Sequence, residues 1–227
     1  MSSDIYSAVA GATATWAQMD VAANNLANVN TTGFRAGRTS FQLIGEGKGV
    51  LGKSSTQATQ VFASTREGAI EKTENPLHFA LSGEGYFSLE DGSLTRDGRF
   101  TLDNQGRMVT QSGLAVMGEG GPIELSPGES LTASPEGILT GSQSGELDRF
   151  KIVNANVEPT GGNQLRATGP TRAATAAVHQ GHLEGSNVDS MGVMVELIEA
   201  GRHFEAFQKA IQASDDATAR LNRVGGS

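Results

Sequence analysis

Apolar residues recur with a helical period at both ends of the chain. Near the N-terminus they alternate spacings of four and three residues, which places them on one stripe of a helix; the stripe contains Ile5, Val9, Ala12, Trp16, Met19, Ala23 and Leu26. Near the C-terminus the same alternation runs through Val193, Leu197, Ala200, Phe204, Phe207, Ile211, Ser214, Thr218 and Leu221, and Met194 and Ile198 widen its start. An isolated amphipathic helix is marginal in water, so each stripe needs a partner, either the other helix or another chain.

The middle of the chain has a different pattern. Residues 35–75 are polar and glycine-rich, and they predict an extended connector with short strands at 41–44 and 60–63. Residues 76–175 contain short apolar runs separated by Asp-Gly, Gln-Gly, Ser-Gly and Pro-Gly turn signals. Such spacing is typical of a small all-β domain. In "TRDGRFTLDNQGRMV" we expect strand, turn and strand, with Gly98 and Gly106 at positive φ.

These patterns together predict an α+β protein. The terminal helices, in residues 1–34 and 176–227, would pair as a coiled-coil-like stalk, and the connector at 35–75 and the β domain at 76–175 would lie between them in sequence. Ser186 or Asn187 is expected to cap the second helix, and Asp189 to complement its dipole.

Composition excludes several classes of protein. The chain has 227 residues, a formal net charge of -8 and no cysteine. Nucleic-acid binding is not expected, because it depends on clustered Lys and Arg. Disulfides and thiolate metal sites are excluded. No apolar run reaches the roughly 20 residues of a membrane-spanning helix, and the N-terminal residues do not resemble a cleavable signal peptide. If the protein leaves the cytoplasm, we expect another route.

One stretch matches a nucleotide-binding motif in its letters. "GKGVLGKS", residues 47–54, fits the phosphate-loop pattern in which backbone amides cradle phosphate and the lysine, here Lys53, reaches the terminal phosphates. That mechanism also requires a buried strand before the loop and an amphipathic helix after it, and neither pattern is present. A flexible connector is therefore favoured over a nucleotide hydrolase that would use Lys53 and Ser54.

Other candidate sites also lack support. His179 and His182 are spaced to share a metal on a helix, but Gly181 lies between them and no further ligand completes a site. His78 and His203 have no evident catalytic partner. We therefore expect no catalytic residue, no cofactor and no metal.

Several stretches, in order along the chain, resemble the axial proteins of the bacterial flagellum, the rod and hook family. The stretches are "ANNLANVNTTGF", "SGEGYF", "LTRDGRFTLDNQGRMVTQSGLAVMG", "LEGSNVD" and "VELIEAGRHFEAFQKAIQASDD". "GEGGPIEL" and "RHFEAFQKAI" are most similar to the proximal rod member of that family, and its distal-rod paralogue is the alternative. The short chain argues against a full hook protein, which would carry additional outer domains.

The resemblance implies a structural, non-enzymatic subunit of the basal-body rod. Family members are exported through the flagellar apparatus and assemble into a hollow tube, with paired terminal helices around the export channel and the β domain outside. The implied partners are copies of the chain, related rod proteins and the export apparatus. The implied assembly residues are Ile5, Val9, Trp16, Met19, Leu26, Leu197, Phe204, Phe207 and Ile211.

The asparagines of the first motif have a further implied role. Their amides donate and accept hydrogen bonds, so they can satisfy the end of a helix or bridge subunits; they are Asn24, Asn25, Asn28 and Asn30. An ordinary frayed helix end is the alternative for these residues. For the whole chain, the competing function is a monomeric β domain that binds carbohydrate or peptide, with peptidoglycan as its target and the helical ends used for oligomerisation.

Overall fold

The computed structural model describes residues 2–45, 54–126, 128–161 and 163–225. The chain divides into two compact units. Unit 1 contains Met1–Leu26, Arg38–Val61 and Asp189–Ser227, and unit 2 contains Ala27–Gly37 and Phe62–Val188. The chain therefore passes between the units four times, and each unit is described by itself.

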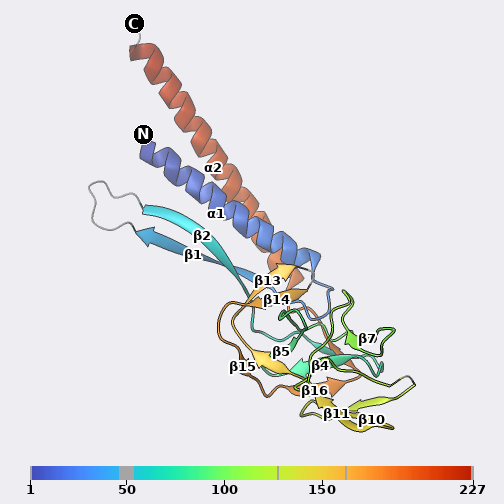
Figure 1. The fold of residues 1–227 in the computed structure, drawn as a ribbon. Coiled ribbons are helices and arrows are strands. Elements are labelled where there is room, and N and C mark those ends of the chain that lie inside the picture. Colours follow the sequence, from blue (N-terminus) through green and yellow to red (C-terminus); the bar gives the residue numbers. More distant parts are fainter. Residues whose placement is uncertain (1, 46–53, 127, 162, 226–227) are drawn as a thin grey trace. The chain divides into compact units, whose positions relative to one another are not determined.

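Unit 1 consists mainly of two long helices and a hairpin. Helices α1 (Ser2–Ala27) and α2 (Ser190–Gly225) are in contact with each other, as the sequence predicted for the stalk. Strands β1 (Gly37–Gly45) and β2 (Ser54–Ala63) pair with each other and extend over the short strands expected at 41–44 and 60–63. Figure 1 shows the hairpin and both helices, with the chain ends at the same end of the helical pair.

The cap of α2 differs from the sequence prediction. Asp189 holds the N-cap position, because its Oδ1 accepts a hydrogen bond of 3.2 Å from the Met191 amide and its carbonyl accepts one of 2.9 Å from Val193. Asn187 instead joins two other segments: its Oδ1 accepts from the Ala36 amide at 2.7 Å, and its Nδ2 donates to the Arg66 carbonyl at 2.6 Å. The prediction of Ser186 or Asn187 as the cap was therefore wrong.

Unit 2 contains the predicted antiparallel β structure. A six-stranded sheet has the order β13-β14-β6-β5-β12-β15, and smaller sheets pair β11-β10-β9, β16-β4, β17-β3 and β7-β8. The strands are β3 (Ile70–Lys72), β4 (Phe79–Ser82), β5 (Tyr86–Ser88), β6 (Leu94–Thr95), β7 (Thr101–Leu102), β8 (Met108–Val109), β9 (Leu131–Ala133), β10 (Ile138–Gly141), β11 (Gly145–Arg149), β12 (Ile152–Asn154), β13 (Val157–Gly161), β14 (Gln164–Ala167), β15 (Arg172–Ala173), β16 (Ala177–Gln180) and β17 (His182–Glu184). All of the strand pairings described in unit 2 are antiparallel.

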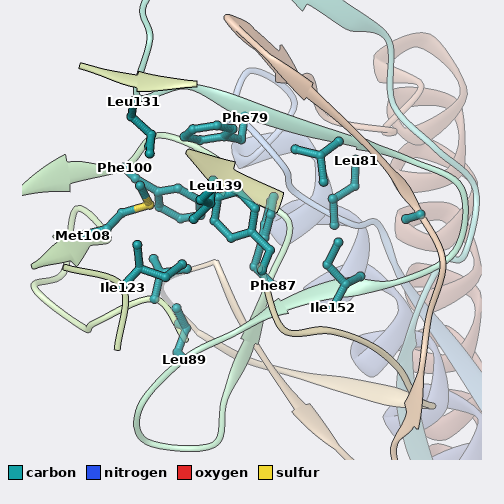
Figure 2. Close-up of a cluster of buried hydrophobic side chains, with 14 of the residues drawn as sticks. Phe79, Leu81, Phe87, Leu89, Phe100, Met108, Ile123, Leu131, Leu139 and Ile152 are labelled. Carbon is teal, nitrogen blue, oxygen red and sulfur yellow. The ribbon is translucent and has the colours of Figure 1, made fainter. Parts of the chain in front are cut away.

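The main hydrophobic core lies in unit 2 and is built around four phenylalanines. Phe79, Phe87, Phe100 and Phe150 are almost fully buried, and Phe87 has its ring centroid 5.2 Å from that of Phe100 and 5.1 Å from that of Phe150. Both contacts are edge-to-face, the arrangement that aromatic quadrupoles favour. Figure 2 shows apolar side chains, Leu139 and Met108 among them, around the labelled rings of Phe79, Phe87 and Phe100. Each buried Phe stabilises the fold by roughly 1.5–3 kcal/mol relative to exposure.

The two glycines predicted at positive φ behave differently. Gly106 has φ of 81°, as expected. Gly98 does not have positive φ; a Cβ at this position would lie 1.6 Å from the Phe79 carbonyl oxygen. Gly98 is therefore needed for close backbone approach, and its predicted turn conformation was wrong.

Candidate assembly interface

One face of α2 is the more protected face. The residues at the predicted spacing are half-buried or buried, whereas most of the positions around them are exposed; the protected residues are Val193, Leu197, Ala200, Phe204, Phe207, Ile211 and Ser214. The Phe207 ring lies directly on α1, since a Cβ on Gly11 would be 2.6 Å from Phe207 Cζ. The apolar stripe of α2 thus packs within the chain.

The protected face of α1 is shifted by one residue from the predicted stripe. It starts at Gly11 and follows the same four-three alternation through Thr15, Gln18, Ala22 and Asn25, of which Thr15, Ala22 and Asn25 are buried. Val9 and Trp16 of the predicted stripe are exposed, with exposed fractions of 46% and 58%, so the contact with α2 does not cover them. Their role in an interface with another chain stays a prediction. Small residues allow helices to approach closely, and a pattern that looked for large apolar side chains missed them. The signal was the regular spacing of Gly, Thr and Ala.

Large apolar side chains remain uncovered on both helices. Val9 and Trp16 are seven residues apart and share one side of α1. On α2 the exposed residues fall at the helical spacing of i, i+3, i+4 and i+7, and we call them the α2 outer face; they are Met191, Met194, Val195 and Ile198, with exposed fractions of 74%, 47%, 55% and 57%. Exposed apolar side chains that gather on one helix face are typical of surfaces at which proteins associate.

The other predicted assembly residues have varied surroundings. Met19 and Leu26 are half-buried, whereas Ile5 lies in α1 with its side chain outside the described part of the structure. Asn25 is buried, Asn28 is half-buried, and Asn24 and Asn30 are exposed. Beyond the end of α1, the Asn28 carbonyl and Oδ1 accept hydrogen bonds of 3.0 and 3.1 Å from the amide and hydroxyl of Thr31. Asn28 therefore stabilises the turn beyond the helix, and subunit bridging by the asparagines stays a prediction.

The chemical motifs do not form a reaction centre among the described residues. The phosphate-loop match falls on 47–54, of which only Ser54 is described. The rings of His179 and His182 have centroids 6.1 Å apart, and the described side chains include no group of three or more potential metal ligands. None of the helices in the described ranges has the length and hydropathy needed to cross a bilayer.

The two terminal helices contact each other, and the β domain lies between them in the sequence. The helices also leave an apolar face uncovered. These features together are typical of structural subunits that associate through helices. Three family models match the chain in order. "Flagella basal body rod protein" matches residues 5–35, "Flagellar hook protein FlgE/F/G D1 domain" matches 80–141, and "Flagellar basal body rod FlgEFG protein C-terminal" matches 179–224.

Full-length relatives agree with these matches. The chain is 31% identical to the flagellar basal-body rod protein FlgF of Escherichia coli, over 97% of each chain, and 31% identical to FlgF of Rhizobium meliloti, over 100% of each. It is 29% identical to the basal-body rod protein FlgG of Bacillus subtilis, over 96% of this chain and 97% of the relative. The chain belongs to the flagellar basal-body rod protein family, whose members are structural and not enzymatic.

Proposed function

We propose that this protein builds the proximal part of the flagellar rod. In this proposal it packs with copies of itself and with related rod proteins into a hollow shaft that crosses the periplasm and transmits torque for swimming. The observation that carries the proposal is the apolar surface left uncovered on the helices, because Trp16 and Ile198 are each more than half exposed in the single chain. Association with neighbouring helices would bury them.

The proximal position is supported by the end-to-end alignment with FlgF of Rhizobium meliloti. It is also supported by "GEGGPIEL" and "RHFEAFQKAI", the stretches most similar to the proximal member. The alternative is the distal position of FlgG, because identity to FlgG of Bacillus subtilis is 29%. Export through the flagellar type III apparatus is part of the proposal, because members of this family are rod components assembled beyond the cytoplasm.

The proposed interface combines exposed and half-buried residues. Val9 and Trp16 contact neighbouring subunits directly, together with the α2 outer face. The remaining apolar members are largely protected within the chain and hold the helical pair in shape; they are Met19, Leu26, Leu197, Phe204, Phe207 and Ile211. Asn24 and Asn30 are exposed, and their amides provide hydrogen bonds to the next subunit.

The test replaces an outward residue and an inward residue separately. Ile198→Asp puts a carboxylate on the α2 outer face, where the single chain leaves it hydrated, so the purified monomer keeps its circular dichroism spectrum. In the rod the carboxylate would be desolvated without a partner, so rods and flagella are not completed. Phe204→Asp disturbs the helical pair itself and blocks assembly as well. Exposed Glu196→Gln on the same helix is the matched control and builds normal flagella.

The readout is electron microscopy of basal bodies from cells that carry each variant as their only copy. Full-length flagella at normal frequency in Ile198→Asp cells would show that the α2 outer face is not an assembly surface.

A further inference from the structure

A buried cluster of three charged side chains lies inside unit 2. The Glu184 carboxylate is placed between two guanidinium groups: its Oε1 is 2.7 Å from Arg35 Nη2 and its Oε2 is 3.0 Å from Arg96 Nη1. The exposed fraction of each of the three side chains is 1% or 2%. We call Arg35, Arg96 and Glu184 the charge cluster.

The charge cluster also binds backbone groups from several loops. Arg35 Nη1 donates to the carbonyls of Thr65 and Arg66, and Glu184 Oε1 accepts from the Gly68 amide at 2.9 Å. Arg96 donates to the Leu81 carbonyl at 2.9 Å and to the Gly83 carbonyl, and its guanidinium lies 5.5 Å from the centre of the Tyr86 ring. The cluster thus joins the segment after α1, the segment after β2 and the β domain.

These contacts coincide with the places where the chain enters and leaves unit 2. The four passages between the units fall after residues 26, 37, 61 and 188. Within unit 2 they adjoin three segments, 27–37, 62–68 and 184–188, and each segment supplies a group to the charge cluster.

Hydrogen bonds outside the cluster tie the same three segments to one another. The Gly33 amide donates to the Glu184 carbonyl at 2.7 Å, and the Ser64 amide donates to the Ala36 carbonyl at 2.8 Å. Asn187 joins Ala36 to Arg66 through the two bonds described above. Every covalent path between the units therefore runs through one connected network.

The charge cluster contributes little stability compared with apolar residues that could fill the same space. Two cations and one anion are removed from water, and such groups are commonly replaced by apolar residues without loss of stability. Burial lowers the pKa of Arg35, and the Glu184 carboxylate opposes that effect. What the cluster provides is fixed geometry, because a guanidinium group donates from a rigid planar fork in several directions at once.

We propose that the charge cluster is a mechanical lock, which fixes all three connecting segments to the β domain so that they cannot separate one at a time under load. Its use in carrying torque rests on the proposed function, whereas the lock itself is a property of unit 2. Glu184 is a positioning residue in this proposal, since it acts by holding Arg35, Arg96 and the Gly68 amide.

Hydrogen exchange of the purified full chain tests the lock. In Glu184→Gln we expect exchange at the amides of Gly33, Ala36 and Gly68 to accelerate about 100-fold or more, because one buried partner of the two guanidinium groups has lost its charge. The core amides of Met108 and Val116, which bond within the β domain, keep their rates. Glu74→Gln makes the same change in an exposed ion pair with Lys72 and leaves every amide unchanged.

A second variant decides the matter if Glu184→Gln does not fold. Arg35→Lys keeps the charge, but an ammonium group cannot hold both the carbonyls of Thr65 and Arg66 and the ion pair with Glu184, so it accelerates the same amides. Equal acceleration at Met108 and Val116 would show that the cluster is only part of the cooperative core and would overturn the proposal. Unchanged exchange at Gly33 and Gly68 would overturn it as well.

Swimming cells test the load-bearing role. Cells with Glu184→Gln are expected to assemble rods and swim in dilute medium, and to lose speed more steeply than Glu74→Gln cells as viscosity rises. Equal speeds at every viscosity would overturn the load-bearing role. A wild-type chain that never enters rods would refute the proposed function, while the exchange measurement would still decide whether the lock exists.

Discussion

Gly33 combines an unusual backbone conformation with close packing. Its φ is 68°, and a Cβ there would lie 2.4 Å from the backbone of Arg96 and Asp97. The glycine of the "NTTGF" motif is therefore required twice, once by conformation and once by space. No local pattern of the sequence could show that residues more than sixty positions away fill the space beside Gly33.

Replacing Gly33 separates these two effects. We expect Gly33→Ala to destabilise the protein by more than ~3 kcal/mol, because left-handed conformation alone costs about 1–2 kcal/mol and the new methyl group also displaces backbone. Gly92 has φ of 80° with open space around it, so Gly92→Ala should cost only about 1–2 kcal/mol. Urea denaturation of both variants measures the difference. Equal losses would mean that the contact with Arg96 contributes nothing.

Glu129 makes the stability of the β domain depend on pH. Its carboxylate accepts hydrogen bonds from the amides of Ser144 and Gln143, which hold the pKa of Glu129 below its ordinary value of 4.5. A lowered folded-state pKa adds stability that is present above about pH 4.5 and is lost as the pH falls through the folded-state pKa.

Glu129→Gln should therefore reduce the loss of stability that occurs as the pH falls into the acidic range. The variant is expected to be less stable than wild type at neutral pH and to approach it as the pH falls below 4.5, the ordinary value. Thermal denaturation across the acidic range is the measurement. A variant whose deficit is the same at every pH would show that the ionised carboxylate is not the source of the stabilisation.

At the scale of elements, the two helices show which structural features the spacing of apolar residues can predict. The four-three alternation predicted both helices and identified the protected face of α2. On α1 the alternation selected the face that contains Trp16, whereas the protected face contains Gly11 and Thr15. A pattern of hydrophobic positions gives little weight to such small side chains. The interface of a helical pair depends on shape as well as hydrophobicity, and shape depends on the partner.

Two glycine replacements test the assignment of faces. A Cβ on Gly11 would meet the Phe207 ring, whereas a Cβ on Gly201 would have nothing within 4 Å. Alanine favours a helix over glycine by up to about 1 kcal/mol, so Gly201→Ala should raise helix content. Gly11→Ala should raise it less or lower it, since Phe207 must move. Circular dichroism compares the two, and an equal rise would place Gly11 away from the helix contact.

At the scale of the whole molecule, stability is distributed unevenly. Both clusters of buried hydrophobic residues lie in unit 2. Where the structure describes the side chains of unit 1, which leaves out 41–60 and the outer ends of both helices, the buried apolar ones are Ala22 and Ala200. The sequence pattern is consistent with this difference. The short β runs contain enough apolar residues for a core, whereas each terminal helix has only one apolar stripe.

Limited proteolysis of the dilute monomer should follow this division. We expect the termini to be cleaved first, because helices with little buried surface open readily, while residues 62–188 of unit 2 survive as a stable fragment. The fragment would be identified by mass spectrometry. Cleavage inside the β domain before the termini are lost would contradict the division.

We propose that the neighbours of this rod subunit bury its uncovered helical faces. Electron cryomicroscopy of intact basal bodies tests it most directly. We expect density for the chain within the proximal rod, with α1 and α2 in the inner layer and with Trp16 and Ile198 covered by adjacent subunits. A map in which the chain is absent from the rod, or in which those two side chains face solvent, would contradict it.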